Sequence, residues 1–420
     1  MIKVFSASWA LLLGMVLLML GNGIQGTLLG IRGAIEGFET WQMSVVMSAY
    51  FAGFLLGSRL APVMIQRVGH VRVFAALGSM ISAVLVLYAA APDWMVWSAL
   101  RVVIGFSFAG VYVTAESWLN NAATNETRGQ TLSLYMIVQM VGIIVAQGLL
   151  NLADPGGYTL FVVASVLVSL AFTPILLSVT PAPGFSTTKS MGLVKLFRIS
   201  PLGCVGIFLM GGVYSALFGM AAVWGSLVGL SVLEISSFVA AIYLGGLLFQ
   251  YPIGALSDRM DRRRLIIGVA ALCMAVSALG AVLPLPFMGL LVVALMIGGL
   301  ANPLYSLLLA HTNDFLQVDD MAGASGSLLF MNGIGAVAGP LVLGWLMGVF
   351  GPPGFFLFIG ALCALMALYG LWRMTRRAAP DVADQGGYTP LTPTASVVTL
   401  DAAFEAAQPD EGETQHAAAR

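Results

Sequence analysis

An arginine inside a long apolar run is the residue that packing alone explains least. Arg101 lies within the apolar stretch 94–118. If that stretch is helical, Arg101 sits ~10 Å from its nearer end. A charged side chain at that depth in lipid is costly, so it normally faces a cavity or a partner. We therefore expect Arg101 to bind an anionic group or to take part in proton coupling. The alternative is a brace that ties its helix to neighbouring backbone carbonyls.

Uncharged polar side chains recur in other apolar runs. Asn22 and Gln25 are three residues apart, so a helix places them on one face. Nearer the middle of their runs lie Tyr135, Gln139, Tyr214, Asn302, Tyr305 and Asn332. Amides and phenols of this kind either line a solute path or form hydrogen bonds between helices. Together with Arg101, they favour a cavity for a small neutral or amphipathic organic solute, with room for an anionic group.

The residue patterns that enzymes and metal sites need are missing. The histidines are far apart, and the sequence has no Gly-rich phosphate loop and no nucleophile elbow. The three cysteines lie in apolar runs without a CxxC spacing: Cys204, Cys273 and Cys363. We expect them to pack rather than to form disulfides. We also expect no enzyme activity, no metal ion, no cofactor and no nucleic-acid partner.

One acid, Glu116, falls inside an apolar run, near its end. We expect Glu116 to pair with Arg72 or Arg128, which lie in loops close to that end. Titration during proton coupling is the alternative. No acid lies near the middle of a run, which weakens any simple carboxylate proton carrier.

The overall composition indicates that lipid surrounds most of these runs. The chain is 59% hydrophobic and 9% charged, whereas soluble proteins are typically about 25% charged. Apolar runs of about 20 residues, enough to span a bilayer as a helix, recur along the chain. We expect twelve of them, at 7–31, 39–61, 71–91, 94–118, 129–152, 158–179, 201–228, 233–257, 264–284, 286–311, 321–348 and 353–373.

These runs divide into two sets of six. The division predicts an all-α integral membrane protein with an N-terminal six-helix bundle over 1–179 and a C-terminal bundle over 201–377. Residues 180–200 have the composition of a linker. The remaining tail, 378–420, is acidic and rich in small polar residues, so we expect it to be disordered.

The distribution of Lys and Arg predicts the orientation. If the N-terminus is cytoplasmic, nearly all loop Lys and Arg fall on the cytoplasmic side, and Arg32 alone falls on the other. We therefore expect a multi-pass membrane protein with both termini in the cytoplasm and membrane lipid among its partners.

The densest charge lies in the stretch GALSDRMDRRRLI, 254–266, where six of the seven residues from Asp258 to Arg264 are charged. The stretch PVMIQRVGHVRVF, 62–74, occupies the corresponding place in the first half. With RVVIGFSFAG at 101–110 and AESWLNN at 115–121, the sequence resembles the major facilitator superfamily, most closely its YcaD-like bacterial branch. Asp261 replaces a glycine of the family's loop motif, and Pro62 and Gln66 replace a glycine and an aspartate in the first-half copy.

The resemblance implies a secondary active transporter of the bacterial inner membrane that works by alternating access. It also implies that Asp258 approaches the start of the fifth span, near Arg128 and Gly129, when the cytoplasmic side is closed. The expected gate is formed by Asp258, Arg259, Arg262, Gln66, Arg67, Arg72, Glu116 and Arg128. Glycine pairs such as Gly53/Gly57 and Gly245/Gly246 are expected at close helix contacts. We expect these contacts on the surfaces where one half slides past the other.

Several properties stay open from the sequence. Proton coupling, the direction of transport and the identity of the small-molecule substrate are undetermined, and a monomer is favoured. The alternative function is a membrane sensor or scaffold that kept the fold without transporting, with the acidic tail as its interaction element.

Overall fold

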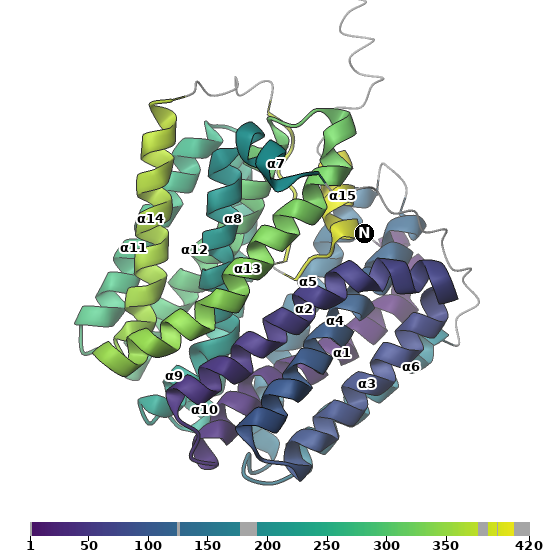
Figure 1. Cartoon of the computed structure of the whole chain (residues 1–420), viewed down its shortest axis with the longest axis vertical. Helices are drawn as coiled ribbons and strands as arrows, with labels where there is room; N and C mark the ends of the chain where they lie inside the picture. The colour runs from purple at the N-terminus through teal and green to yellow at the C-terminus, as the bar shows by residue number, and fades with distance from the viewer. Residues whose placement is uncertain (1, 124–126, 177–190, 377–384, 393, 407–420) are drawn as a thin grey trace, which may run out of the picture.

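The computed structural model describes residues 2–123, 127–176, 191–376, 385–392 and 394–406. Within these ranges the chain is almost entirely helical (Figure 1). The first half contains α1 (Ile2–Ile35), α2 (Thr40–Val68), α3 (His70–Ala90), α4 (Trp94–Ala122), α5 (Arg128–Leu149), the 3-10 turn η1 (Leu150–Leu152) and α6 (Thr159–Leu176). The second half contains α7 (Leu193–Ile199), α8 (Pro201–Ser215), the π-helical segment η2 (Ala216–Met220), α9 (Ala221–Leu227), α10 (Val232–Ser257), α11 (Arg262–Val282), α12 (Phe287–Asn313), α13 (Val318–Phe350) and α14 (Gly354–Met374), and α15 (Val397–Ala406) follows.

The helices match the apolar runs that predicted them. Eleven helical segments among the described residues are long and apolar enough to cross a membrane. The expected sixth span corresponds to α6, a shorter apolar helix, and residues 177–179 lie outside the described ranges. The expected seventh span is helical throughout but changes its winding, from α8 through η2 to α9. The prediction of an all-α membrane fold is confirmed.

Equivalent helix pairs pack equally closely in the two halves. A Cβ atom added to Gly53 on α2 would lie 2.0 Å from the carbonyl oxygen of Val102 on α4. A Cβ atom added to Gly245 on α10 would lie 1.9 Å from the carbonyl oxygen of Leu295 on α12. These glycines therefore bring backbones together within each half. Our expectation that they lie on sliding surfaces between the halves was wrong.

The two halves lie side by side (Figure 1). We call the end of the molecule where α4, α10 and α12 finish the tail end, because α15 lies there, and the other the opposite end. Toward the opposite end the halves touch directly. Ser48 Oγ donates to the carbonyl oxygen of Val337 at 2.6 Å, and Asn151 Nδ2 donates to Ser236 Oγ at 3.1 Å.

Residues 385–392 and 394–406, which we call the inner tail, are ordered against the bundle. This corrects the expected disorder over that part of 378–420; residues 378–384 and 407–420 lie outside the described ranges. The helix α15 lies between α13 of one half and α4 and α5 of the other (Figure 1). Leu391, Leu400 and Phe404 are buried. The acidic average of the whole tail hides this apolar segment, which has enough apolar surface to pack.

The expected linker is also partly structured. Residues 180–190 lie outside the described ranges, but α7 packs along α13. The N–H of Met191 donates to the carbonyl oxygen of Gly323 at 2.8 Å, and Lys195 forms an ion pair with Asp320 at 2.6 Å.

Candidate functional site

A cavity of about 130 Å³ lies between the two halves. Its walls come from α1, α2, α4 and α5 of the first half and from α8, η2, α10, α12 and α13 of the second. Thr392 and Thr394 of the inner tail complete the lining. Because both halves contribute, relative movement of the halves changes the cavity directly.

Arg101 lies on the cavity wall with 3% of its surface exposed. Its guanidinium donates to Gln25 Oε1 at 3.0 Å, contacts the sulfur of Met47 at 2.6 Å, and lies 4.9 Å from the ring centre of Tyr50. Among the described residues no carboxylate forms an ion pair with Arg101. A buried cation held by neutral groups is poorly compensated. An anionic group entering the cavity would supply the missing counter-charge.

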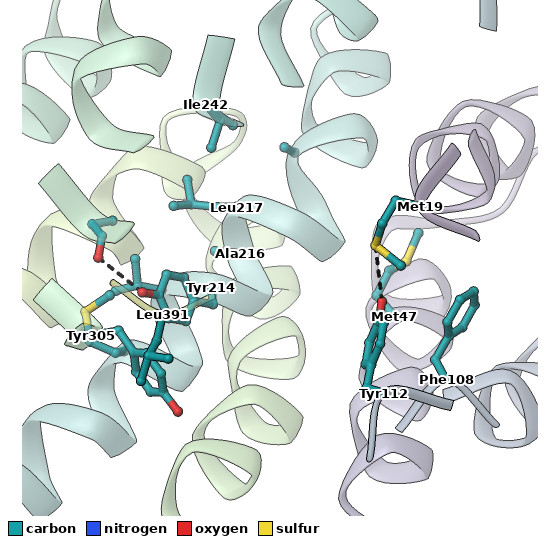
Figure 2. Packing of buried hydrophobic residues seen from close by; sticks show 14 of the residues in the cluster. Met19, Met47, Phe108, Tyr112, Tyr214, Ala216, Leu217, Ile242, Tyr305 and Leu391 are labelled. Carbon is teal, nitrogen blue, oxygen red and sulfur yellow. Dashed lines mark hydrogen bonds between the residues drawn. The ribbon is translucent and has the colours of Figure 1, made fainter. Parts of the chain in front are cut away.

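Hydrogen bonds run from Arg101 along the first-half wall in one direction. Gln25 Nε2 donates to Asn22 Oδ1 at 3.1 Å, and Asn22 Nδ2 donates to the Tyr112 hydroxyl at 3.2 Å. That hydroxyl points at the sulfur of Met19, 3.7 Å away (Figure 2). Since each amide donates away from Arg101 and accepts on the side facing it, the network fixes the orientation of both amides. It ends on a weak acceptor, the thioether of Met19.

The second-half wall is aromatic. Tyr214 stacks on Phe218 with ring centres 5.6 Å apart, and Phe218 stacks on Tyr243 at 4.6 Å. Phe218 belongs to η2, and π-helical turns of this kind often occur at functional sites. Figure 2 shows Tyr214 and Leu217 across from Met47 and Tyr112 of the first half. The wall offers apolar faces to a solute, whereas the Arg101 side offers hydrogen bonds.

The structure brings most of the predicted cavity residues together. Seven of them line the cavity: Asn22, Gln25, Arg101, Gln139, Tyr214, Asn302 and Asn332. The other two lie behind the wall. Tyr135 donates to Glu116 Oε1 at 3.0 Å, and Tyr305 packs edge-on against Tyr214 with ring centres 5.7 Å apart.

Sequence reasoning missed several lining residues: Tyr50, Phe54, Tyr112, Gln147, Phe218 and Tyr243. Five of these are aromatic, and aromatic residues in apolar runs are usually core residues, so nothing in their type marked them. Gln147 is different: an amide inside an apolar run was a usable signal that the sequence reasoning passed over. For the aromatic residues, helical spacing gave the one usable signal. Tyr50 and Phe54 are four apart on α2, and Tyr112 lies eleven residues after Arg101, three helical turns along the same face of α4.

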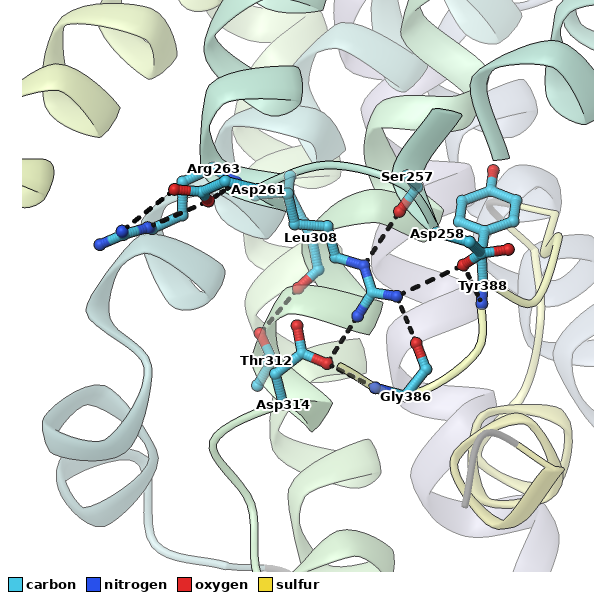
Figure 3. A network of polar contacts seen from close by, with 10 residues as sticks. Ser257, Asp258, Asp261, Arg263, Leu308, Thr312, Asp314, Gly386 and Tyr388 are labelled. Carbon is cyan, nitrogen blue, oxygen red and sulfur yellow. Dashed lines mark hydrogen bonds and ion pairs between the residues drawn. The ribbon is translucent and has the colours of Figure 1, made fainter. Parts of the chain in front are cut away.

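The charged loop that was expected to form a gate binds the inner tail (Figure 3). Asp258 accepts from the N–H of Tyr388 at 3.0 Å. Arg262 is buried, donates to Asp314 at 2.6 Å and also donates to the carbonyl oxygen of Gly386. Burial raises the pKa of the Asp314 carboxyl, and the Arg262 guanidinium opposes that shift.

The remaining expected gate residues lie mostly at the surface. Arg259, Gln66, Arg67 and Arg72 are exposed, and Arg128 is half-buried at the start of α5. Glu116 departs from expectation. Instead of pairing with Arg72 or Arg128, it accepts from Tyr135 and, at 2.9 Å, from the N–H of Ser396. The inner tail supplies donors that the sequence did not suggest.

Two known proteins are similar in sequence to this chain over most of its length. The YcaD protein of Escherichia fergusonii, an uncharacterized MFS-type transporter, is 28% identical over 382 residues, covering 89% of this chain and 97% of the relative. The Escherichia coli O45:K1 protein of that name is 27% identical, covering 85% and 93%.

Solved structures share the fold. The nucleoside transporter NupG aligns with a TM-score of 0.75 at 17% identity, covering 88% of this chain and 99% of NupG. A bacterial homologue of the human lysosomal transporter Spinster, in an inward-facing and unoccupied conformation, aligns with a TM-score of 0.66 at 16% identity, covering 96% of each chain. The family model of the Major Facilitator Superfamily matches residues 11–240 and 203–404. The chain therefore belongs to the Major Facilitator Superfamily, and it is a secondary transporter.

Proposed function

We propose that this transporter carries a small amphipathic organic solute with an anionic or strongly hydrogen-bond-accepting group, which Arg101 binds. The observation that carries the proposal is the buried guanidinium on the cavity wall, which has no carboxylate partner among the described residues. Arginine binds carboxylates and phosphates through a planar fork of donors. In a site shielded from water, such a contact is strong.

The rest of the cavity supports an amphipathic solute rather than a bare ion. Tyr214, Phe218 and Tyr243 present aromatic faces, and Gln139 and Asn332 add amides from different halves. Ligand sites commonly combine an apolar lining with a few directed polar groups. The solute would lie with its acceptor group toward Arg101 and its apolar body against the aromatic wall.

We further propose that the tail end faces the cytoplasm of a bacterial cell and that the solute crosses the inner membrane by alternating access. Basic residues support this orientation. Arg262, Arg263 and Arg264 begin α11 at the tail end, whereas Arg32, toward the opposite end, is neutralised by Glu36 at 2.6 Å. Excess Lys and Arg mark the cytoplasmic side of membrane proteins.

A thermal-shift screen tests the substrate class. Purified protein is screened against organic carboxylates, organic phosphates and neutral amphipathic molecules, as wild type, Arg101→Gln and Arg59→Gln. A ligand at 100 times its Kd stabilises the folded state by about 2.7 kcal/mol. Arg59 is the matched control, because it is exposed and lies over the ring of Phe330 at 3.9 Å.

We expect anionic hits that stabilise wild type and Arg59→Gln but not Arg101→Gln. Hits that stabilise all three proteins equally would contradict the role of Arg101.

A further inference from the structure

We propose that the inner tail is an autoinhibitory segment: it occupies the tail-end mouth of the cavity, holds the two halves apart there, and must leave before transport can proceed. This inference rests on the proposed alternating access. It concerns a different part of the chain from Arg101 and makes a prediction that needs no solute.

Apolar side chains of the inner tail are buried inside the bundle rather than lying on its surface. Leu391 and Phe404 are each 3% exposed, and Ala395 and Leu400 are fully buried. In Figure 1, α15 lies between the helices of the two halves. A segment in this position prevents α4 and α5 from approaching α13.

Main-chain N–H groups of the inner tail bind side chains of both halves. In the second half, Gly386 donates to Asp314 at 3.1 Å, Tyr388 to Asp258 at 3.0 Å, and Leu391 to Ser306 at 3.0 Å. In the first half, Ser396 donates to Glu116 at 2.9 Å. Figure 3 shows the first two contacts beside the Arg262 network. Three of the four acceptors are carboxylates, which accept hydrogen bonds strongly.

The inner tail also reaches the solute cavity. Thr394 Oγ1 donates to Gln139 Oε1 at 3.1 Å, and both Thr392 and Thr394 line the cavity wall. Gln139 is one of the amides that we assign to solute binding. The inner tail therefore blocks the path at the tail end and uses a polar group that a solute would otherwise contact.

Electron–electron distance measurements test this directly. Spin labels are attached at Gly129→Cys on α5 and Leu256→Cys on α10, both exposed at the tail end, in a protein whose three buried cysteines are replaced by alanine. Four proteins are compared in the absence of solute: the full chain, a chain ending at Arg376, Leu400→Asp, and Leu193→Asp. Leu400→Asp places a charge at a buried position. Leu193→Asp makes the same change at an exposed leucine of α7, outside the inner tail.

We expect a long distance in the full chain and in Leu193→Asp. In the shortened chain and in Leu400→Asp, a shorter-distance population should appear. Adding a synthetic peptide of residues 385–406 to the shortened chain should restore the long distance. An unchanged distribution after tail removal would overturn the proposal, as would an equal response in Leu193→Asp. Because no solute is present, failure here is separate from failure of the Arg101 screen.

Discussion

The main-chain N–H of Ser396 donates to the carboxylate of Glu116 at 2.9 Å, across 280 residues of sequence. The other carboxylate oxygen of Glu116 accepts from the hydroxyl of Tyr135 at 3.0 Å. Glu116 is 2% exposed, so water contributes little to its solvation. Glu116 and the main-chain N–H of Ser396 therefore satisfy each other's hydrogen-bonding capacity.

Replacing Glu116 tests this contact. In Glu116→Ala the N–H of Ser396 loses its acceptor, and a buried unsatisfied donor costs about 1–3 kcal/mol. We expect amide hydrogen exchange across 394–400 to rise about tenfold or more in the full-length protein. Ser117→Ala is the control, because the Ser117 hydroxyl donates within its own helix, to the carbonyl oxygen of Val113 at 2.7 Å. Similar exchange in both variants would mean that Glu116 does not hold the inner tail.

Two ion pairs of equal length should differ in their effect on stability. Arg262 and Asp314 are 2.6 Å apart, with 1% of each side chain exposed. Lys195 and Asp320 are also 2.6 Å apart, but their side chains are 58% and 24% exposed. Breaking a buried pair strands a charge and costs about 3–5 kcal/mol, whereas an exposed pair contributes about 0–1 kcal/mol.

We therefore expect Asp314→Asn to lower the melting temperature of the purified protein clearly and Asp320→Asn to leave it nearly unchanged. Asp258 lies 3.6 Å from Arg262 and partly compensates, so the loss in Asp314→Asn should fall toward the lower end of that range. Equal melting temperatures for the two variants would show that the Arg262 pair is not buried as described.

Gly53 of the first half tests the close approach of α2 and α4. In Gly53→Ala the new Cβ would meet the carbonyl oxygen of Val102 at 2.0 Å, so the helices must separate. We expect a loss of about 1–3 kcal/mol, typical of overpacking, seen as a lower melting temperature. Gly148→Ala on α5 is the control, since its Cβ has open space. A helix gains up to about 1 kcal/mol from such a change. If Gly53→Ala melted as high as Gly148→Ala, the close approach would be disproved.

The fold was predictable from the sequence because lipid imposes one simple rule on composition. Runs long and apolar enough to span a bilayer recur, and the spans follow from their lengths. Hydropathy does not resolve which face of a helix meets which neighbour. For that reason Gly53 and Gly245 were assigned to the wrong surfaces, although their small size did signal close contact.

The site was partly predictable because polar residues in lipid are rare and expensive. Arg101, Gln25 and Asn22 were chosen on that basis, and the structure joins them in one hydrogen-bonded network. Of the aromatic wall only Tyr214 was predicted, because Phe218 and Tyr243 look like ordinary core residues in an apolar run.

The inner tail was missed for a different reason. Its average composition is that of a disordered chain, but VVTLDAAF at 397–404 is an apolar helical segment. Its contacts use main-chain N–H groups, which every residue except proline possesses, so no residue type marks them. Considered apart from the acidic residues that follow it, this segment is apolar enough to pack against the bundle.

The most direct test asks whether transport of the solute depends on Arg101. Proteoliposomes containing the chain that ends at Arg376 are loaded with an anionic hit from the thermal-shift screen, and exchange of the radiolabelled hit is measured. Three proteins are compared in that background: the unmodified shortened chain, Arg101→Gln and Arg59→Gln. We predict rapid exchange by the unmodified chain and by Arg59→Gln, and exchange at the rate of protein-free liposomes by Arg101→Gln. Exchange by Arg101→Gln as fast as by Arg59→Gln would contradict the claim that Arg101 binds the transported solute.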